Sequence, residues 1–214
     1  MTNDNETKDK IIKVALRLFS RDGYNETSIR SLAKEASVNI ASINYYFKNK
    51  LGLYKACFFT LRQEAQRIAK KLDASPVTAI EVKKTLEQFT NELIDLYVQD
   101  PNLISLVIVE LKKTMVLDRS VVQARFLELY LSIEKFFIYL KENGFVSPAA
   151  DTHIMAISFY GSIIHAISFD QKRKDQFNVC LRDDLEFRKK FASQLAQLYT
   201  FGMKEYGEEN EKEN

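Results

Sequence analysis

Residues 27–50 read TSIRSLAKEASVNIASINYYFKNK, and this stretch sets the architecture of the N-terminal region. Thr27 or Ser28 can cap a short helix, because a hydroxyl at that position accepts a hydrogen bond from a free N–H of the first turn. Asn39 can cap a second short helix in the same way. Residues 36–38 form a tight connection between the two. Two short helices joined by such a turn are the layout of a helix-turn-helix.

The outward side of the second short helix has the chemistry expected of a DNA-binding surface. Ile43 and Phe47 face the core, which leaves short hydrogen-bonding side chains and an aromatic ring outside, suited to base edges and phosphates. Lys48 and Lys50 follow at the start of the next helix, where a cation and free backbone N–H groups can meet a phosphate. The predicted DNA-binding residues are Thr27, Ser28, Arg30, Asn39, Ser42, Asn44, Tyr45, Tyr46, Lys48 and Lys50.

The distribution of charge supports this interpretation. The net charge of the whole chain is only +2, too small by itself to indicate nucleic acid or membrane as a partner. Between residues 8 and 50, however, nine Lys and Arg residues stand against four Asp and Glu residues. The basic charge is therefore concentrated where a nucleic-acid site needs it. An ordinary helical hairpin with a solvated basic face is the alternative, and it explains neither the caps nor the exposed polar helix.

The rest of the chain also has helical periodicity. Its 214 residues include only 6 Gly and 3 Pro, which leaves little room for a turn-rich sandwich or barrel, and 46% are hydrophobic, enough for a sizeable core. No segment alternates as a strand does. The sequence therefore predicts an all-α protein with nine helices, at residues 8–22, 28–36, 40–46, 50–72, 76–98, 101–115, 119–142, 148–170 and 184–206.

Several of these helix boundaries rest on local signals. A capping side chain stands directly before each proline, at Ser75-Pro76, Asp100-Pro101 and Ser147-Pro148, as at the first turn of a helix. Asp118 and Asp183 are expected to cap two further helices. Residues 171–183 are expected to be a solvated loop.

Other classes of protein are excluded by what the sequence lacks. The polar N-terminus has no secretory signal, and residues 152–169, although uncharged, contain serines and histidines that favour a buried helix over a membrane span. Cys57 and Cys180 form no CxxC pair, so we expect a reduced cytoplasmic protein without a disulfide framework. No histidine pair, nucleophile motif or phosphate-binding loop is present, so we expect no enzyme activity, no metal and no cofactor.

Residues 11–56 contain an ordered set with characteristic spacing, namely Ala15, Phe19, Gly23, Tyr24, Thr27, Ile29, Ala33, Val38, Ile43, Tyr46, Phe47, Lys50, Leu53 and Tyr54. With this set, the segment resembles the DNA-binding region of the tetracycline-repressor (TetR) family of bacterial regulators. Ser37 and Ala41 stand where such proteins often carry glycine, and Asn44 stands where an aromatic residue is common. Leu51-Gly52 replaces the usual acidic pair, and we expect the first turn of this helix to be soft.

The resemblance implies a nine-helix fold in two parts. Residues 1–50 would be the DNA-binding domain, with the motif at about 27–47, residues 51–206 a ligand-binding and dimerisation domain, and residues 207–214 a polar tail. It also implies a homodimeric transcriptional regulator, a repressor in preference to an activator. A small apolar or aromatic inducer would release it from a pseudopalindromic operator in double-stranded DNA. The alternative is a helical small-molecule-binding protein that does not bind DNA.

Small residues recur at helical spacing within residues 148–170 and predict a close helix–helix seam. In proteins that this chain resembles, the last two helices of each subunit form the dimer interface. His165 is interpreted as a satisfied polar residue of the seam, a ligand contact being the alternative. The predicted interface residues are Ser158, Gly161, Ser162, His165, Phe191, Leu195 and Leu198.

The middle of the chain is rich in Phe and Tyr, which either fill a core or line a ligand pocket. Glu110 lies at helical spacing on the apolar face of its segment, so its carboxylate must find a partner, reach the rim or line a pocket. The predicted ligand-binding residues are Phe58, Phe89, Leu93, Glu110, Leu111, Phe126, Tyr130 and Phe159.

Overall fold

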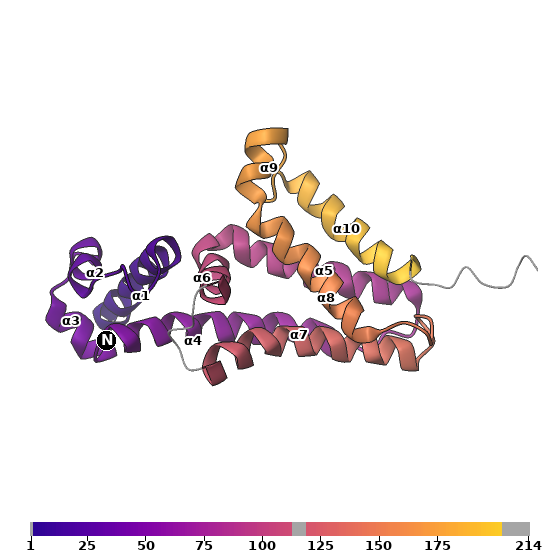
Figure 1. Ribbon diagram of the computed structural model, residues 1–214, viewed down its shortest axis with the longest axis horizontal. Helices are drawn as coiled ribbons and strands as arrows, with labels where there is room; N and C mark the ends of the chain where they lie inside the picture. Colours follow the sequence, from indigo (N-terminus) through magenta and orange to yellow (C-terminus); the bar gives the residue numbers. More distant parts are fainter. Residues whose placement is uncertain (1, 113–118, 203–214) are drawn as a thin grey trace, which may run out of the picture. The chain divides into compact units, whose positions relative to one another are not determined.

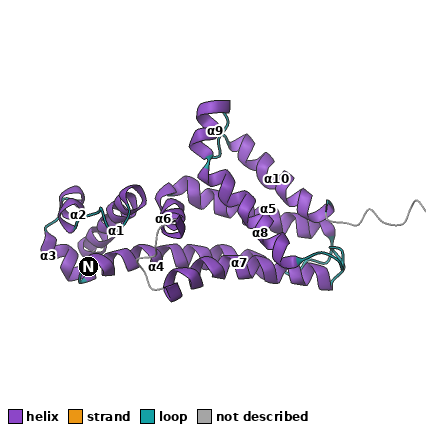
Figure 2. Ribbon diagram, viewed as in Figure 1, coloured by secondary structure: helices purple, strands orange, loops and turns teal. Residues whose placement is uncertain are grey.

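The computed structural model describes the backbone of residues 2–112 and 119–202, and the side chains of residues 4–60, 62–106 and 129–202. Within these backbone ranges the chain is helical and has no strand, which confirms the all-α prediction (Figures 1 and 2). The helices are α1 (Thr2–Asp22), α2 (Ile29–Ala36), α3 (Ile40–Phe47), α4 (Lys50–Ala69), the 3-10 helix η1 (Lys70–Asp73), α5 (Ala79–Gln99), α6 (Pro101–Lys112), α7 (Arg119–Glu142), α8 (Thr152–Ser168), α9 (Asp170–Phe177) and α10 (Leu185–Phe201).

Only one of the three proline signals marks a helix start, at Pro101 of α6. Helix α5 begins three residues after Pro76, because Thr78 and Glu81 cap its first turn reciprocally. The Thr78 hydroxyl accepts the N–H of Glu81 at 3.2 Å, and the Glu81 carboxylate accepts the N–H of Thr78 at 3.2 Å. A competing cap therefore displaces the predicted helix start.

The predicted start of α8 is also wrong because another residue caps the helix. Asp151, rather than the Ser147-Pro148 pair, caps this helix by accepting the N–H groups of His153 and Ile154 at 2.9 and 3.1 Å. Likewise, Asp184 caps α10 in place of Asp183. Asp118 and the predicted helix ends at residues 115 and 206 lie outside the described residues.

Helix α9 replaces the predicted loop and brings the α-helices of the described residues to ten instead of nine. Its sequence, DQKRKDQF, has no apolar face, so helical periodicity gives no signal for it. A buried carboxylate fixes it instead: Asp170, only 2% exposed, accepts the N–H of Leu181 at 2.6 Å and the guanidinium of Arg173 at 3.0 Å. The helix therefore depends on tertiary contacts that the local sequence does not reveal.

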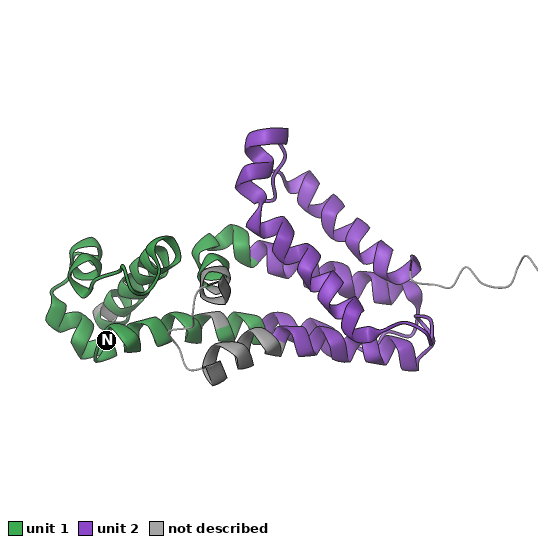
Figure 3. Cartoon of the chain, viewed as in Figure 1, with its two compact units in different colours: residues 1–66, 96–128 green, residues 67–95, 129–214 purple. Residues whose placement is uncertain are grey.

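The chain divides into two compact units, residues 1–66 with 96–128 and residues 67–95 with 129–214 (Figure 3). The first unit extends beyond the predicted domain of residues 1–50, since it includes most of α4 and the whole of α6. A division of the chain by function, into DNA-binding and ligand-binding parts, stays a prediction.

An aromatic cluster forms the core of the first unit. The ring of Phe19 packs edge-on against that of Tyr54 at 4.8 Å, and Tyr24 and Phe58 lie 4.9 and 5.1 Å from Tyr54. Burial of Cys57 beside them raises the pKa of its thiol to about 12, as expected of a core residue. Helix α1, at the centre of this unit, contacts both α2 and α6.

The core of the second unit is also aromatic. Phe159 of α8 contacts Phe89 of α5, Phe137 of α7 and Tyr199 of α10, with ring centroids 6.1, 5.8 and 5.1 Å apart. All four side chains are buried. Phe159 thus joins four helices of this unit.

Candidate nucleic-acid interface

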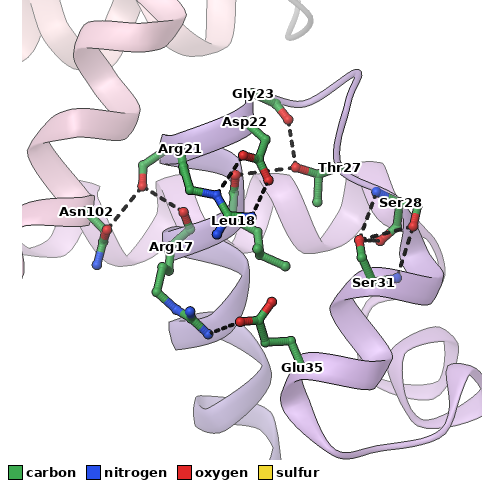
Figure 4. Close-up of polar contacts among 11 residues, drawn as sticks. Arg17, Leu18, Arg21, Asp22, Gly23, Thr27, Ser28, Ser31, Glu35 and Asn102 are labelled. Carbon is green, nitrogen blue, oxygen red and sulfur yellow. Dashed lines mark hydrogen bonds and ion pairs between the residues drawn. The ribbon is translucent and has the colours of Figure 1, made fainter.

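The start of α2 is fixed by a reciprocal cap and by a buried threonine. The Ser28 hydroxyl accepts the N–H of Ser31 at 3.0 Å, and the Ser31 hydroxyl accepts the N–H of Ser28 at 3.2 Å (Figure 4). Thr27, 2% exposed, donates its hydroxyl to the carbonyl of Gly23 at 2.8 Å. Thr27 was expected to bind DNA. Its side chain is instead buried, and its hydroxyl is hydrogen-bonded within the fold.

A left-handed residue makes the turn between α2 and α3. Ser37 has φ 52° and ψ 45°. The N–H groups of Ser37 and Val38 donate to the carbonyls of Lys34 and Ala33 at 3.1 and 3.0 Å, which is a Schellman motif. Asn39 then caps α3, and its side-chain oxygen accepts both the N–H and the hydroxyl of Ser42, at 2.6 and 2.9 Å.

Helix α3 is anchored on one side and exposed on the other, as predicted. Ile43 and Phe47 are buried at 0% and 6% exposure. Asn44 and Tyr45 are exposed, Tyr45 to 77%. The side-chain oxygen of Asn39 is already hydrogen-bonded to Ser42. The side chains of Asn44 and Tyr45 are therefore the best placed on α3 to contact a partner.

The junction between α3 and α4 is tight. Lys48 has φ 66° and ψ −44°, and the N–H of Asn49 donates to the carbonyl of Phe47 at 2.8 Å, which makes a γ-turn centred on Lys48. That carbonyl leaves no room for a side chain at Gly52, whose Cβ would lie 1.9 Å from the Phe47 oxygen. Asn49 caps α4 by accepting the N–H of Gly52 at 2.9 Å. Close backbone approach therefore explains the glycine, while the softness of this first turn stays a prediction.

Lys50 holds the loop before α2. Its ammonium donates to the carbonyls of Tyr24 and Thr27, each at 2.9 Å, and lies 4.2 Å from the centroid of the Tyr24 ring. The sequence predicted that this cation meets a DNA phosphate. In the structure it ties the start of α4 to the loop between α1 and α2, so Lys50 has a positioning role.

The other predicted DNA-binding residues around α3 differ in how far they are exposed to a partner. Arg30 and Lys48 are exposed, whereas Tyr46 is half-buried and donates its hydroxyl to Asp4 of α1. This hydrogen bond raises the pKa of Tyr46 to about 12, so the phenol stays neutral at physiological pH. Arg17 of α1 is paired with Glu35 of α2 at 2.8 Å (Figure 4).

Sequence reasoning missed two cations near α3. A groove of about 410 Å³ in the first unit is lined by Lys8 of α1 and Lys55 of α4 together with Lys48. Lys8 and Lys55 both lie outside the motif at residues 27–47. The excess of basic charge between residues 8 and 50 includes Lys8, whereas no sequence signal pointed to Lys55. The remaining lining residues are Tyr46, Phe47, Gly52, Ala56 and Phe59.

The predicted ligand-binding residues are not brought together around one described cavity. Phe58 is buried in the first unit, whereas Phe89, Leu93 and Phe159 are buried in the second. Tyr130 is half-buried, and its hydroxyl lies 2.5 Å from Nδ1 of His153. The side chains of Glu110, Leu111 and Phe126 lie outside the described residues.

Most of the predicted interface residues lie at the surface of the second unit. Five of the seven line a hollow of about 930 Å³ formed by α8, α9 and α10. Leu198 of α10 is 54% exposed, whereas Leu195 is buried at 8%. The residues that line the hollow are Ser158, Gly161, Ser162, His165 and Phe191.

The described residues offer neither a metal site nor a single membrane-spanning helix. They contain no group of three His, Cys, Asp or Glu side chains that could hold a metal ion. No single described helix is long and apolar enough to cross a membrane; α8 and α9 pass that test only as a pair bent by 61°.

Comparison with known proteins places the motif in a family. The model of the tetR family of bacterial regulatory proteins matches residues 11–57. YttP of Bacillus subtilis (strain 168), named a probable HTH-type transcriptional regulator, is 57% identical over 47 residues, which are 22% of this chain and 23% of YttP. IcaR of Staphylococcus aureus (strain Newman), named a negative transcriptional regulator of the biofilm operon icaADBC, is 42% identical over 55 residues, 24% of this chain and 30% of IcaR. The chain thus matches less than a third of either relative.

The fold comparison extends over most of the chain. The crystal structure of FadR from Bacillus subtilis in complex with stearoyl-CoA is similar with a TM-score of 0.69, covering 90% of this chain and 97% of that one at 18% identity. At this identity the likeness shows the fold alone. Residues 11–57 are therefore similar to the tetR family of bacterial regulatory proteins, and the chain as a whole shares the all-α fold of the FadR structure.

Proposed function

We propose that the chain is a DNA-binding transcriptional regulator in which α3 enters the major groove. The observation that carries this proposal is the two-sided character of α3, with Ile43 and Phe47 buried and Asn44 and Tyr45 exposed. An asparagine amide can bond bidentately to adenine, and an exposed tyrosine can contact phosphate or a thymine methyl group. Because the function is exercised on DNA, we place the protein in the cytoplasm.

The test is DNA binding on the gene's own upstream region. Footprinting should reveal a pseudopalindromic operator, and Asn44→Ala should change the preference at one base of each half-site by about 1–3 kcal/mol. Lys84→Ala, an exposed change in α5, is the control and should bind like the wild type. Unchanged affinity and base preference in an Asn44→Ala/Tyr45→Ala double variant would reject α3 as the helix that contacts bases.

We also propose that the regulator acts as a homodimer through α8 and α10. The side chains of Ile154 and Ile157 are 60% and 52% exposed, and they continue the stripe of Ser158, Gly161 and His165 along one side of α8. Leu198 and Phe201 of α10 are 54% and 45% exposed. Apolar side chains gathered in this way favour a partner surface. A dimer would also match a two-fold operator, with half-sites about 34–36 Å apart or a multiple of that distance.

We infer further that the protein is a repressor released by an apolar or aromatic small molecule. The name of IcaR as a negative regulator and the stearoyl-CoA bound to FadR support this reading of the family resemblance. Stearoyl-CoA is therefore the first probe to use, in calorimetric titrations with and without operator DNA. An inducer must bind more weakly when DNA is present, typically by about 5- to 150-fold, because the coupling is reciprocal. Equal affinity in both titrations rules the probe out as an inducer.

A helical small-molecule-binding protein without DNA binding is the second candidate. It is favoured only by the aromatic residues of the middle section, which a ligand pocket would also use. Retention on DNA that weakens as salt rises separates the two candidates, since phosphate contacts release counterions.

A further inference from the structure

The groove of about 410 Å³ in the first unit combines residues from three elements that the sequence keeps apart. Lys8 comes from the second turn of α1, Lys48 from the turn after α3, and Lys55 from the second turn of α4. All three side chains are exposed. Between them, Phe47, Gly52 and Ala56 line the groove. The three ammonium groups therefore border one concave surface, although 47 positions separate Lys8 from Lys55 in the chain.

The first turn of α1 holds Lys8 at this groove. Asp4 accepts the hydroxyl of Tyr46, which itself lines the groove. Asp4 and Lys8 are four residues apart in a helix, so their side chains lie on the same face. The contact between Asp4 and Tyr46 thus turns this face of α1 toward the C-terminal end of α3.

The three lysines of the groove are not engaged by the fold, unlike other cations of the first unit. Lys50 is committed to two backbone carbonyls, and Arg17 and Arg21 are paired with Glu35 and Asp22. Within the described side chains, by contrast, no carboxylate pairs with Lys8, Lys48 or Lys55. Three unneutralised ammonium groups around one groove repel one another, and an anion placed among them relieves that repulsion.

The start of α4 adds positive potential to the same place. Asn49 caps this helix and Lys48 immediately precedes the cap, so the groove lies beside a helix N-terminus. The groove is open rather than enclosed, and its three lysines are exposed, which suits the phosphates of a large polyanion better than a small buried ion.

We propose that this groove binds the phosphate backbone of duplex DNA beside the bases that α3 contacts, with Lys8 and Lys55 as phosphate-binding residues in addition to Lys48. The proposal rests on the DNA-binding function proposed above and extends the interface from the helix-turn-helix to the second turns of α1 and α4. These contacts carry no base information, so they strengthen binding to every DNA sequence alike.

The test is the salt dependence of DNA binding by a Lys8→Gln/Lys55→Gln variant. The operator duplex found by footprinting and a scrambled duplex of equal length are titrated by fluorescence anisotropy at several salt concentrations. Loss of two phosphate contacts should flatten the slope of log affinity against log salt by about 1.8 units. The affinities for operator and scrambled DNA should fall by the same factor. The control, Lys84→Gln/Lys189→Gln, removes the same charge from exposed positions in the second unit and should leave the slope unchanged.

The other possible outcomes distinguish failure of this inference from failure of the proposed function. If the variant binds the operator with the wild-type slope, the groove takes no DNA phosphate and the inference fails, while the proposed function stands. If the ratio of operator to scrambled affinity falls instead, the lysines act by shaping α3, which also overturns the inference. If inorganic phosphate at constant ionic strength abolishes the difference between wild type and variant, the groove binds free phosphate rather than DNA. A wild-type protein without salt-dependent DNA binding would reject the proposed function together with the inference.

Discussion

Ser37 adopts a left-handed backbone, φ 52° and ψ 45°, at the turn that joins α2 to α3. A residue with a Cβ is strained there by about 1–2 kcal/mol. We expect Ser37→Gly to raise the free energy of unfolding by about 1 kcal/mol, measured by urea denaturation. Ser37→Ala keeps the Cβ and removes only the hydroxyl, so it should give no gain. Equal gains from both variants would show that backbone strain is not the cause.

Gly52 illustrates the opposite case, in which a glycine is required by its surroundings. Any Cβ at this position meets the Phe47 carbonyl oxygen at 1.9 Å, and both atoms belong to backbones that are fixed by hydrogen bonds. Gly52→Ala should therefore lower the free energy of unfolding by about 1–3 kcal/mol, as overpacking does. The midpoint of urea denaturation measures this loss.

A second change at the same junction serves as the control for Gly52→Ala. Lys48→Gly relieves the positive φ of 66° and should not lower stability. An alanine at position 52 that leaves the denaturation midpoint unchanged would mean that α4 starts elsewhere in solution.

At the scale of elements, prediction from sequence succeeds where local signals act alone. The caps Ser28 and Asn39 and the buried pair Ile43 and Phe47 give α2 and α3 almost to the residue. It fails for α9, whose charged sequence carries no periodicity and whose position depends on the buried carboxylate of Asp170.

In the candidate site, too, some residues could be predicted from local sequence patterns and others could not. Its exposed residues Asn44 and Tyr45 could be predicted from their places on α3. The contact of Asp4 with Tyr46 joins residues 42 positions apart and could not be predicted. The commitment of Lys50 to the carbonyl of Tyr24, 26 positions away, is equally invisible to local patterns.

An ion-pair cluster of the second unit gives an element-scale prediction. Glu92 of α5 is paired with Arg67 at the end of α4 and with Lys71 of η1, the latter at 3.3 Å. The hydrogen bond from Arg67 is the main cause that holds the pKa of Glu92 below its ordinary value of 4.5. Since the folded state lowers this pKa, the cluster stabilises the protein above pH 4.5, and this contribution is lost as the pH falls through the folded pKa.

Glu92→Gln should therefore cost about 0.5–1 kcal/mol of stability at pH 7, a value typical of partly exposed pairs. The difference from wild type should vanish in denaturation experiments at acid pH. Glu26→Gln, an exposed change outside the cluster, should show no such pH dependence. A difference that persists unchanged at low pH would contradict an electrostatic origin.

The molecule as a whole is similar to known proteins at two levels. Sequence identity with YttP is 57% but extends over only 47 residues, whereas the fold is shared over 90% of the chain with FadR at 18% identity. Fold conservation without sequence conservation is expected where a helical scaffold is kept and its pockets and surfaces change. The dimer interface and any effector must therefore be tested on this chain itself.

Gly161 provides that test for the dimer. It is exposed on α8, and a Cβ built on it meets no atom within 4 Å among the described residues. The fold of one subunit can therefore accept a larger side chain here, so any harm must come from a partner. Gly161→Leu should shift the protein from dimer to monomer in sedimentation experiments and abolish operator binding, with a circular dichroism spectrum like that of the wild type.

Lys84→Leu, which places the same side chain on the exposed side of α5, should remain dimeric. A fully dimeric Gly161→Leu variant at low micromolar concentration would move the interface away from this stripe.

The turns that bracket α3 have a consequence for how such proteins diversify. An isolated eight-residue helix would not persist in water, so α3 exists only because the Ser37 and Lys48 turns fix its two ends and Ile43 and Phe47 fix its inner side. None of these restraints involves the outward side chains at positions 41, 44 and 45. With α3 as the proposed base-contacting helix, substitutions there would change operator preference while the restraints that hold the helix stay in place. The same freedom makes these three positions the natural ones to randomise when a new operator specificity is selected in the laboratory.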